Sequence, residues 1–279
     1  MPRKTVLDLQ KMKAGNHRIA MVTAYDYTMA RLVDASGVDM VLVGDSLGMV
    51  VQGRSDTLAV TLDDMVYHGR CVARGLEQAH LTVDLPFMTY QLGPTQALQS
   101  AGRLVQEAGA QSVKLEGGER SAPAIEAIVQ AGIPVVGHVG LTPQSVNALG
   151  GFRVQGRGDE GAEKLIRDAQ AVEAAGAFCV VLEMVPAELA AEVTAALSVP
   201  TIGIGAGPGC DGQVLVANDL LGLDTRFQPR FVRRFAQLES PILEAVGAYI
   251  AAVRDGTFPG PEHSFHRKQR GPAKVARLY

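Results

Sequence analysis

Short apolar runs alternate with helical patterns along most of this chain, and few folds accommodate that arrangement. The apolar runs cover residues 19–24, 40–45, 80–86, 112–118, 134–140, 178–183, 200–205 and 214–218. The helical patterns cover residues 27–36, 62–79, 93–108, 122–130, 160–175 and 187–197. Most of these runs are apolar throughout rather than alternating with polar residues, so they predict parallel strands covered on both faces. Eight such strands favour an α/β fold of the (β/α)8, or TIM-barrel, type, and an open doubly wound sheet is the alternative.

Two further helical segments flank this repeat. Residues 5–14 form a short amphipathic pattern before the first strand. Residues 230–254 follow the last strand, with a predicted break at Pro241 and apolar residues that could pack on the barrel or on a neighbouring subunit. We therefore expect a single barrel domain with flanking helices over residues 1–266 and an irregular tail over 267–279.

Composition narrows the class of protein. Hydrophobic residues make up 47% of the chain, enough for a large core, and the formal net charge of -3 gives no basic surface for a nucleic acid. No apolar run reaches the ~20 residues of a membrane span, and no signal segment is evident. Cys71, Cys179 and Cys210 lack paired or metal-binding spacing. These features favour a cytoplasmic protein that acts on small molecules.

Polar residues stand at the ends of several predicted strands, where barrels carry their active sites. They are Asp45, Asp84, Lys114, Glu116, His138 and Glu183. Carboxylates without cysteine or histidine partners at ligand spacing indicate a hard cation, Mg2+. A lysine beside them could bind an anionic substrate or form an imine, and a remaining carboxylate could act as a base. Together these residues predict carbon–carbon chemistry next to a metal-bound carbonyl.

Each residue also has an ordinary structural interpretation. Asp84 could be a turn residue, Lys114 could pair with a glutamate, and His138 could be a core histidine. Glu183, within an apolar run, is harder to explain without a partner or a function. Because the pattern repeats on several strands, the functional interpretation is favoured.

The glycine-rich run over residues 202–209 is a weak signal for dinucleotide binding, because it lies late in the chain rather than after the first strand. Close backbone packing at the barrel rim is the preferred interpretation.

Several longer runs of the chain are distinctive. They are TAYDYTMARLVDASGVDMVLVGDSLGMVVQG, VTLDDMVYHGRCVARG, SVKLEGG, GHVGLTPQSVNALGGFRVQGR, VLEMVPAELA and PTIGIGAGPGCDGQVLV. Together these runs resemble the ketopantoate hydroxymethyltransferase family. The resemblance covers about residues 5–265 and implies a barrel like those of the phosphoenolpyruvate/pyruvate enzymes. It also implies transfer of a hydroxymethyl group from 5,10-methylenetetrahydrofolate to 3-methyl-2-oxobutanoate. The product would be ketopantoate (2-dehydropantoate), an early intermediate of pantothenate and coenzyme A biosynthesis.

The resemblance implies roles for the residues that match the family motifs. Asp45 of GDS and Asp84 of VDLPF match the Mg2+ carboxylates, and Glu116 of KLEGG matches a third acid of the metal site, directly or through water. Positions around the substrate are matched by Asp45, Ser46, Asp84, Lys114 and His138.

Glu183 of VLE matches the proton acceptor of the family. We expect its apolar sequence neighbours to desolvate its carboxylate and so strengthen it as a base. The family forms homo-oligomers, usually decamers, which implies an assembly of that kind here. Departures are minor: Met184 stands where the family often has Cys, Phe152 where it often has Tyr, and residues 54–56 carry a differently ordered polar trio.

Two other functions remain open at this point. The chain could be another metal-dependent 2-oxoacid lyase or mutase of the same barrel type, although such enzymes typically carry a loop cysteine and residues 117–120 contain none. It could also be a non-catalytic binding protein, although such a protein is expected to have lost some of the acids and none is missing here.

Overall fold

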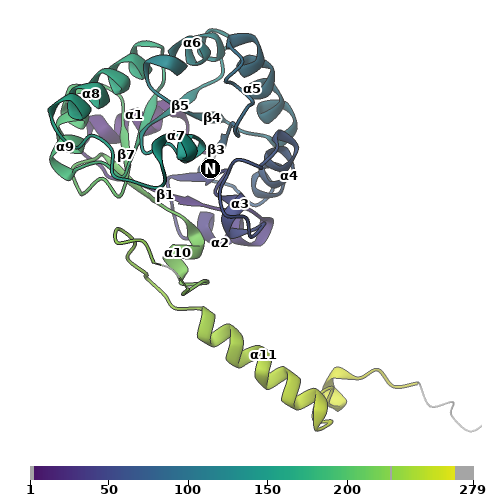
Figure 1. Cartoon of the computed structure of the whole chain (residues 1–279). Coiled ribbons are helices and arrows are strands. Elements are labelled where there is room, and N and C mark those ends of the chain that lie inside the picture. The colour runs from purple at the N-terminus through teal and green to yellow at the C-terminus, as the bar shows by residue number, and fades with distance from the viewer. Residues whose placement is uncertain (1–2, 227, 268–279) are drawn as a thin grey trace, which may run out of the picture.

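The computed structural model describes residues 3–226 and 228–267. Its strands are β1 (Ile19–Thr23), β2 (Met40–Val43), β3 (His80–Asp84), β4 (Ser112–Glu116), β5 (Val135–Gly140), β6 (Cys179–Glu183), β7 (Thr201–Ile204) and β8 (Gly212–Leu215). All pairs are parallel, and β8 pairs with β1, so the sheet closes in sequence order (Figure 1). The predicted (β/α)8 barrel is confirmed, and the doubly wound alternative is wrong because β1 has a partner on each side.

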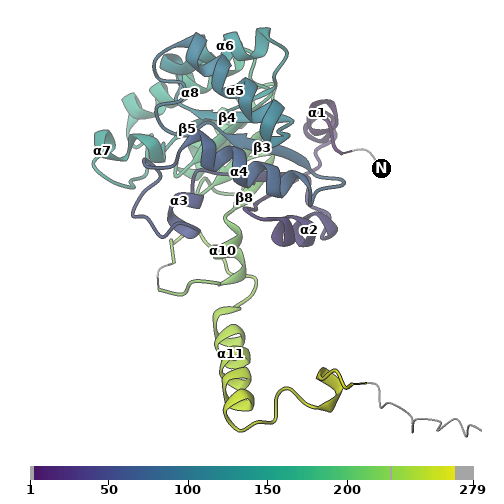
Figure 2. The same cartoon turned by 90° about the vertical axis from the view of Figure 1, so that its right-hand side faces the viewer.

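Helices surround this barrel (Figures 1 and 2). The longer ones are α2 (Tyr27–Ala35), α4 (Leu62–Ala73), α5 (Pro94–Ala108), α6 (Ala122–Gln130), α8 (Asp159–Ala174) and α9 (Ala187–Ala196). Local chemistry sets their ends. Thr61 and Asp64 form a capping box that begins α4, and Gly109, with a φ of 76°, ends α5.

Short helical turns occupy the connections. They are α3 (Leu47–Val50), η1 (Glu119–Ser121), η2 (Pro143–Ser145), α7 (Val146–Leu149), α10 (Ala217–Leu221) and η3 (Pro261–His263). The sequence predicted plain connections over residues 48–61 and 141–157, because single turns are too short for a periodic pattern to emerge.

Strand alternation divides the core into two layers. Val41 and Val43 of β2 point outward and pack beneath the helices, whereas Met40 and Leu42 point into the barrel. Leu9 of α1 (Val6–Ala14) joins this inner layer, so α1 closes the amino-terminal end of the barrel. The functional residues are therefore confined to the opposite end.

Two element boundaries differ from the predicted ones for identifiable reasons. The last strand spans Gly212–Leu215 rather than residues 214–218. Its first residue, Gly212, pairs with Ile19 of β1. A Cβ at position 212 would lie 2.4 Å from the Ile19 carbonyl oxygen, so only glycine allows the two strands to pair there. The helix α4 ends at Ala73 rather than residue 79, because the chain must pass close to α2. A Cβ at Gly75 would lie 2.7 Å from the Tyr27 carbonyl oxygen.

The carboxyl-terminal helix α11 (Glu239–Arg254) is continuous through Pro241, contrary to the predicted break. Pro241 lies in the first turn, where the missing N–H leaves no helical hydrogen bond unmade. The helix stands away from the barrel and has no buried residue (Figures 1 and 2), so it does not pack on its own barrel. The predicted irregular tail lies, from residue 268 onward, outside the described residues, and the domain boundary at residue 266 stays a prediction.

The outer face of the β8–β1 junction is less covered than the rest of the sheet. Ala20 of β1 and Gln213 of β8 point outward and are exposed, whereas β2, β3 and β4 are buried throughout. A cavity of about 1320 Å³ lies along this face and reaches Phe231 and Phe235. Within residues 3–226 and 228–267, no helix combines the length and apolar character that crossing a membrane requires.

Candidate active site

The polar residues predicted from the strand ends converge at the carboxyl-terminal mouth of the barrel. Neighbouring strands place Asp84 beside Lys114 and Glu116 beside His138 in the sheet register. Asp45 lies two residues after the end of β2, and Glu183 ends β6. The ionisable side chains of β3, β4 and β5 at this mouth are all buried, so they interact with one another rather than with bulk water.

Asp84 and Lys114 form an ion pair, with Lys114 Nζ 2.9 Å from Asp84 Oδ1. The other carboxylate oxygen of Asp84 accepts a hydrogen bond from the Asp45 backbone N–H at 3.1 Å. Burial acts to lower the pKa of Lys114, but the charges of Asp84, Glu116 and Asp45 outweigh it and raise the pKa above its usual value. Lys114 is therefore a cation held among carboxylates.

Asp45 and Glu116 are joined through Gln144, a residue of η2. The Gln144 side-chain amide donates to Asp45 Oδ2 at 2.8 Å, and its backbone N–H donates to Glu116 Oε2 at 3.0 Å. Burial, with the charge of Asp84, raises the pKa of Asp45 to about 7. Burial, with the charge of Asp45, raises the pKa of Glu116 well above its usual value. The cluster thus holds more negative charge than Lys114 offsets.

His138 connects the acids to Glu183. Its Nε2 lies 3.2 Å from Glu183 Oε2, and its Nδ1 lies 3.5 Å from Lys114 Nζ and 3.6 Å from Glu116 Oε1. Burial, with the Lys114 charge, lowers the pKa of His138, so the ring is neutral. With Nδ1 beside the Lys114 ammonium, we assign the single ring proton to Nε2, facing Glu183.

The environment of Glu183 differs from the predicted apolar one. Val180 and Leu182 belong to the outer layer of the core, on the opposite face of β6, so they do not surround the carboxylate. The Glu183 side chain is 17% exposed and faces the mouth beside His138. Val181 shares the inner face of β6 with Glu183, so the prediction from sequence neighbours holds for Val181 and fails for Val180 and Leu182, because successive strand residues point to opposite faces.

Ser46 stands at the rim of the cluster, where its Oγ lies 2.8 Å from the Tyr25 hydroxyl oxygen. Tyr25 follows β1 and is buried, and burial raises the pKa of its hydroxyl above the usual value. Tyr90 is a second supporting hydroxyl, which donates to Gln144 Oε1 at 2.6 Å and accepts from the Glu116 backbone N–H at 3.1 Å.

Sequence reasoning did not assign roles to Tyr25, Tyr90 and Gln144. Two features of the sequence could have pointed to them. One is Tyr25, directly after the first predicted strand, and the other is the TPQS run after the fifth, which contains Gln144.

The donor set fits a hard divalent cation. Asp45, Asp84, Glu116 and Glu183 supply oxygen donors, and Lys114 is the cation paired with one of them. Within the described residues no group of three or more histidine, cysteine or acidic side chains is arranged so that it could hold a metal ion by itself. Mg2+ needs no such group, because it commonly binds one or two carboxylates and completes its octahedron with water and substrate oxygens.

A closed parallel barrel with buried acids, a lysine and a histidine at its carboxyl end defines the class: a (β/α)8 barrel whose fold is similar to that of solved phosphoenolpyruvate mutase/isocitrate lyase proteins. Phosphonopyruvate hydrolase in complex with oxalate and Mg2+ has a TM-score of 0.62 at 13% identity, covering 93% of each chain. A 2,3-dimethylmalate lyase of the phosphoenolpyruvate mutase/isocitrate lyase superfamily has a TM-score of 0.59 at 18% identity, covering 96% of this chain and 92% of that one. These likenesses establish the fold.

Sequence comparison identifies the family. The model of the ketopantoate hydroxymethyltransferase family matches residues 3–261. The 3-methyl-2-oxobutanoate hydroxymethyltransferase of Syntrophotalea carbinolica is 59% identical, over 94% of this chain and 98% of that protein. The protein of the same name from Chloroflexus aurantiacus is 57% identical, over 98% of this chain and 96% of that protein. This chain belongs to the ketopantoate hydroxymethyltransferase family, as its motifs predicted.

Proposed function

We propose that this chain transfers a hydroxymethyl group from 5,10-methylenetetrahydrofolate to 3-methyl-2-oxobutanoate and so forms 2-dehydropantoate, an early step of pantothenate and coenzyme A biosynthesis. The overall reaction consumes one water and releases tetrahydrofolate. Family membership supports the activity. The observation that carries the mechanism is the position of Glu183. It lies on β6, four strands around the barrel from β2, so it faces the mouth from the side opposite Asp45.

Asp45 and Asp84 would hold Mg2+, with Glu116 as a third acid, directly or through water. When bound, the ion would polarise the keto and carboxylate oxygens of the 2-oxoacid as a Lewis acid. Gln144 keeps one oxygen of Asp45 and one of Glu116 occupied, and thereby orients the remaining oxygen of each carboxylate.

Lys114 and Ser46 are placed to bind the substrate. The Lys114 ammonium, held by Asp84, supplies a fixed positive charge for the 2-oxoacid carboxylate. An amine that is protonated and ion-paired is a poor nucleophile, so the arrangement favours binding over an imine. Ser46 presents its hydroxyl from the rim, where Tyr25 orients it.

Glu183 would accept the proton from C3 of the 2-oxoacid, next to the ketone. The carboxylate is accessible from the mouth, and the neutral His138 holds one of its oxygens in place. The carbanion at C3 then forms a bond with the methylene carbon of the donor as one of the two carbon–nitrogen bonds of that carbon breaks. Water supplies the hydroxyl group as the second carbon–nitrogen bond breaks, and the two donor nitrogens take up the proton from C3 and one proton from water. His138 serves as the positioning residue for this base.

Exchange of the C3 proton tests the proposal without the donor. In D2O with Mg2+ and 3-methyl-2-oxobutanoate, the unchanged protein should exchange this proton, and Glu183→Gln should not while still binding the 2-oxoacid. Glu188→Gln, an exposed glutamate of the first turn of α9, is the matched control. Normal exchange in Glu183→Gln would assign the base elsewhere, and a borohydride-trapped adduct on Lys114 would establish the imine route. Absence of 2-dehydropantoate formation by the unchanged protein with both substrates would contradict the activity itself.

We also propose that the chain acts as a homo-oligomer, a decamer by family resemblance. The exposed apolar residues of α11 and the open face of β8 and β1 support contacts between copies. A cytoplasmic location stays a prediction.

A further inference from the structure

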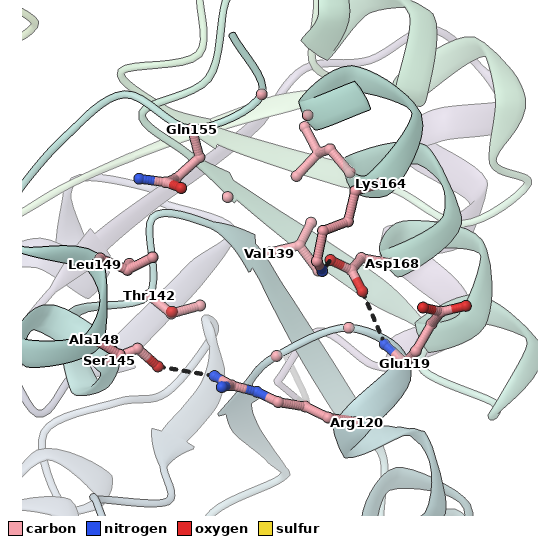
Figure 3. A pocket seen from close by; sticks show the side chains of 16 residues that line it. Glu119, Arg120, Val139, Thr142, Ser145, Ala148, Leu149, Gln155, Lys164 and Asp168 are labelled. Atoms are coloured by element: carbon pink, nitrogen blue, oxygen red, sulfur yellow. Dashed lines mark hydrogen bonds and ion pairs between the residues drawn. The ribbon is translucent and has the colours of Figure 1, made fainter. Parts of the chain in front are cut away.

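A second cavity, of about 570 Å³, is lined by the connections that follow β4 and β5 and by α8 (Figure 3). Its walls are the segment 117–120 after β4, the segment from Val139 to Ser145 after β5, and the first turns of α8. These segments directly continue from Glu116, His138 and Gln144, so the cavity and the active site share a wall. Both lie at the carboxyl-terminal side of the barrel, because the segments 117–120 and 140–145 follow β4 and β5.

The two basic side chains of this cavity, Lys164 and Arg120, differ in whether a carboxylate neutralises them. Lys164 pairs with Asp168, which also accepts a hydrogen bond from the Glu119 backbone N–H at 3.0 Å. Arg120 reaches toward the opposite wall, where its Nη2 donates to Ser145 Oγ at 2.8 Å (Figure 3). Within the described part of the chain, Arg120 has no carboxylate at ion-pair distance, in contrast to Lys164. Its guanidinium therefore offers a positive charge and free N–H groups to an anion.

The rest of the lining suits a flat, partly apolar group. Val139, Leu149 and Leu165 supply apolar side chains, and Gln155 supplies an amide on the wall opposite Arg120 (Figure 3). A volume of about 570 Å³ lies within the range of small-molecule sites. An apolar wall with one unpaired guanidinium fits an aromatic ring that carries a carboxylate tail.

We propose that this cavity binds the aminobenzoyl-glutamate tail of the one-carbon donor, with Arg120 pairing with a tail carboxylate. This inference rests on the proposed function, because it requires a donor of that chemistry. The donor would place its reactive methylene over the mouth, near Glu183, while its tail crosses the wall formed by residues 142–145. Arg120 binds the donor at a distance from the reacting carbons and takes no part in bond formation.

The tail itself provides the test. Donors made from tetrahydrofolate and from its diamide, in which both glutamate carboxylates are carboxamides, are compared in the unchanged protein and in Arg120→Met. We expect Arg120→Met to raise KM for the tetrahydrofolate donor roughly tenfold, the lower end of what a charge-assisted hydrogen bond contributes. KM for the diamide donor should stay unchanged, and Arg120→Lys should recover part of the loss. Arg31→Met, an exposed arginine of α2, is the matched control.

Direct binding of tetrahydrofolate, measured by calorimetry without turnover, gives a second readout that should weaken in Arg120→Met in the same proportion. Equal KM values for both donors in both proteins, or equal binding of tetrahydrofolate, would contradict the cavity proposal and leave the hydroxymethyl transfer standing. A loss that is the same for both donors would assign Arg120 a structural role and would also contradict the proposal. Failure of the unchanged protein to use either donor would instead contradict the proposed function.

Discussion

The side-chain amide of Gln144 donates to Asp45 Oδ2 at 2.8 Å and also to the Leu85 carbonyl oxygen at 2.9 Å. It thereby ties the connection after β5 to the ends of β2 and β3. The same residue donates its backbone N–H to Glu116. One glutamine therefore controls the orientation of two acids that lie on different strands.

Replacing this glutamine tests that role. Gln144→Leu should reduce kcat/KM roughly 10- to 100-fold, as is typical for residues that orient a metal-binding carboxylate. The fall should be accompanied by weaker Mg2+ binding in calorimetry, because Asp45 and Glu116 lose their fixed orientation. Gln130→Leu, at an exposed position of α6, should behave as the unchanged protein. Unaltered Mg2+ affinity in Gln144→Leu would show that the amide does not position the metal site.

Removing the Asp84 carboxylate should impair the binding of the metal and of the substrate together. Asp84→Asn removes a carboxylate charge and the ion-pair partner of Lys114. We expect Mn2+ binding, followed by electron paramagnetic resonance, to weaken by more than the roughly 10- to 100-fold typical of a supporting residue. Activity should fall with it. The exposed Asp63, changed to Asn, is the control, and full metal affinity and activity in Asp84→Asn would remove it from the metal site.

His80 should make the fold sensitive to acid. It lies buried at the start of β3, with Nδ1 3.1 Å from the Lys4 carbonyl oxygen and Nε2 2.9 Å from Ser112 Oγ. Burial lowers the pKa of His80 from 6.5 to about 4. Between these values the unfolded chain binds a proton that the folded chain does not, so stability is lost as the pH falls from about 6.5 toward 4.

The size of this effect follows from the two pKa values. Lowering the pH from 8 to 5 should cost the folded state about 2 kcal/mol through His80 alone. Urea unfolding at both pH values measures this change in the free energy of unfolding. In His80→Gln the change should be smaller by the contribution of His80, and the contributions of other titratable groups should remain. His263→Gln, at an exposed position, should retain it. The same pH dependence in His80→Gln and the unchanged protein would contradict the assignment.

Assembly should depend on α11. Its apolar residues lie at helical spacing and are exposed, with Val246 51% and Ile250 39% accessible. Val246→Glu should lower the mass measured by light scattering, whereas Leu7→Glu, at an exposed position of α1, should leave the mass unchanged. A stable monomer of the unchanged protein at micromolar concentration would overturn the homo-oligomer proposal.

Most of the barrel could be predicted because its strands are apolar throughout and end in polar residues. Asp84 and Glu116 were recognisable for that reason, because burying a carboxylate at the end of an apolar strand costs free energy unless the carboxylate is paired or functional. Their convergence then followed from the parallel order of the strands. The break predicted at Pro241 failed because the pattern did not show that the helix begins only two residues earlier, at Glu239.

The supporting residues could not be predicted on the same grounds. Gln144 lies in a connection where a glutamine is unremarkable, and its role depends on contacts with residues far away in the sequence. The surroundings of Glu183 were mistaken because sequence neighbours were treated as spatial neighbours, although Leu182 faces the outer layer of the core. The direction of each side chain, and its contacts with residues far away in the sequence, are set only when the sheet closes into a barrel.

The pairing of Ile19 with Gly212 joins the first strand of the sheet to the last. A chain that leaves the ribosome amino-terminus first presents β1 as an unpaired edge until β8 has been synthesised. Asp84 and Lys114 emerge long before that moment, and while the sheet is open, water can still reach the pair. The dry surroundings on which this ion pair depends are thus among the last properties that the nascent protein acquires.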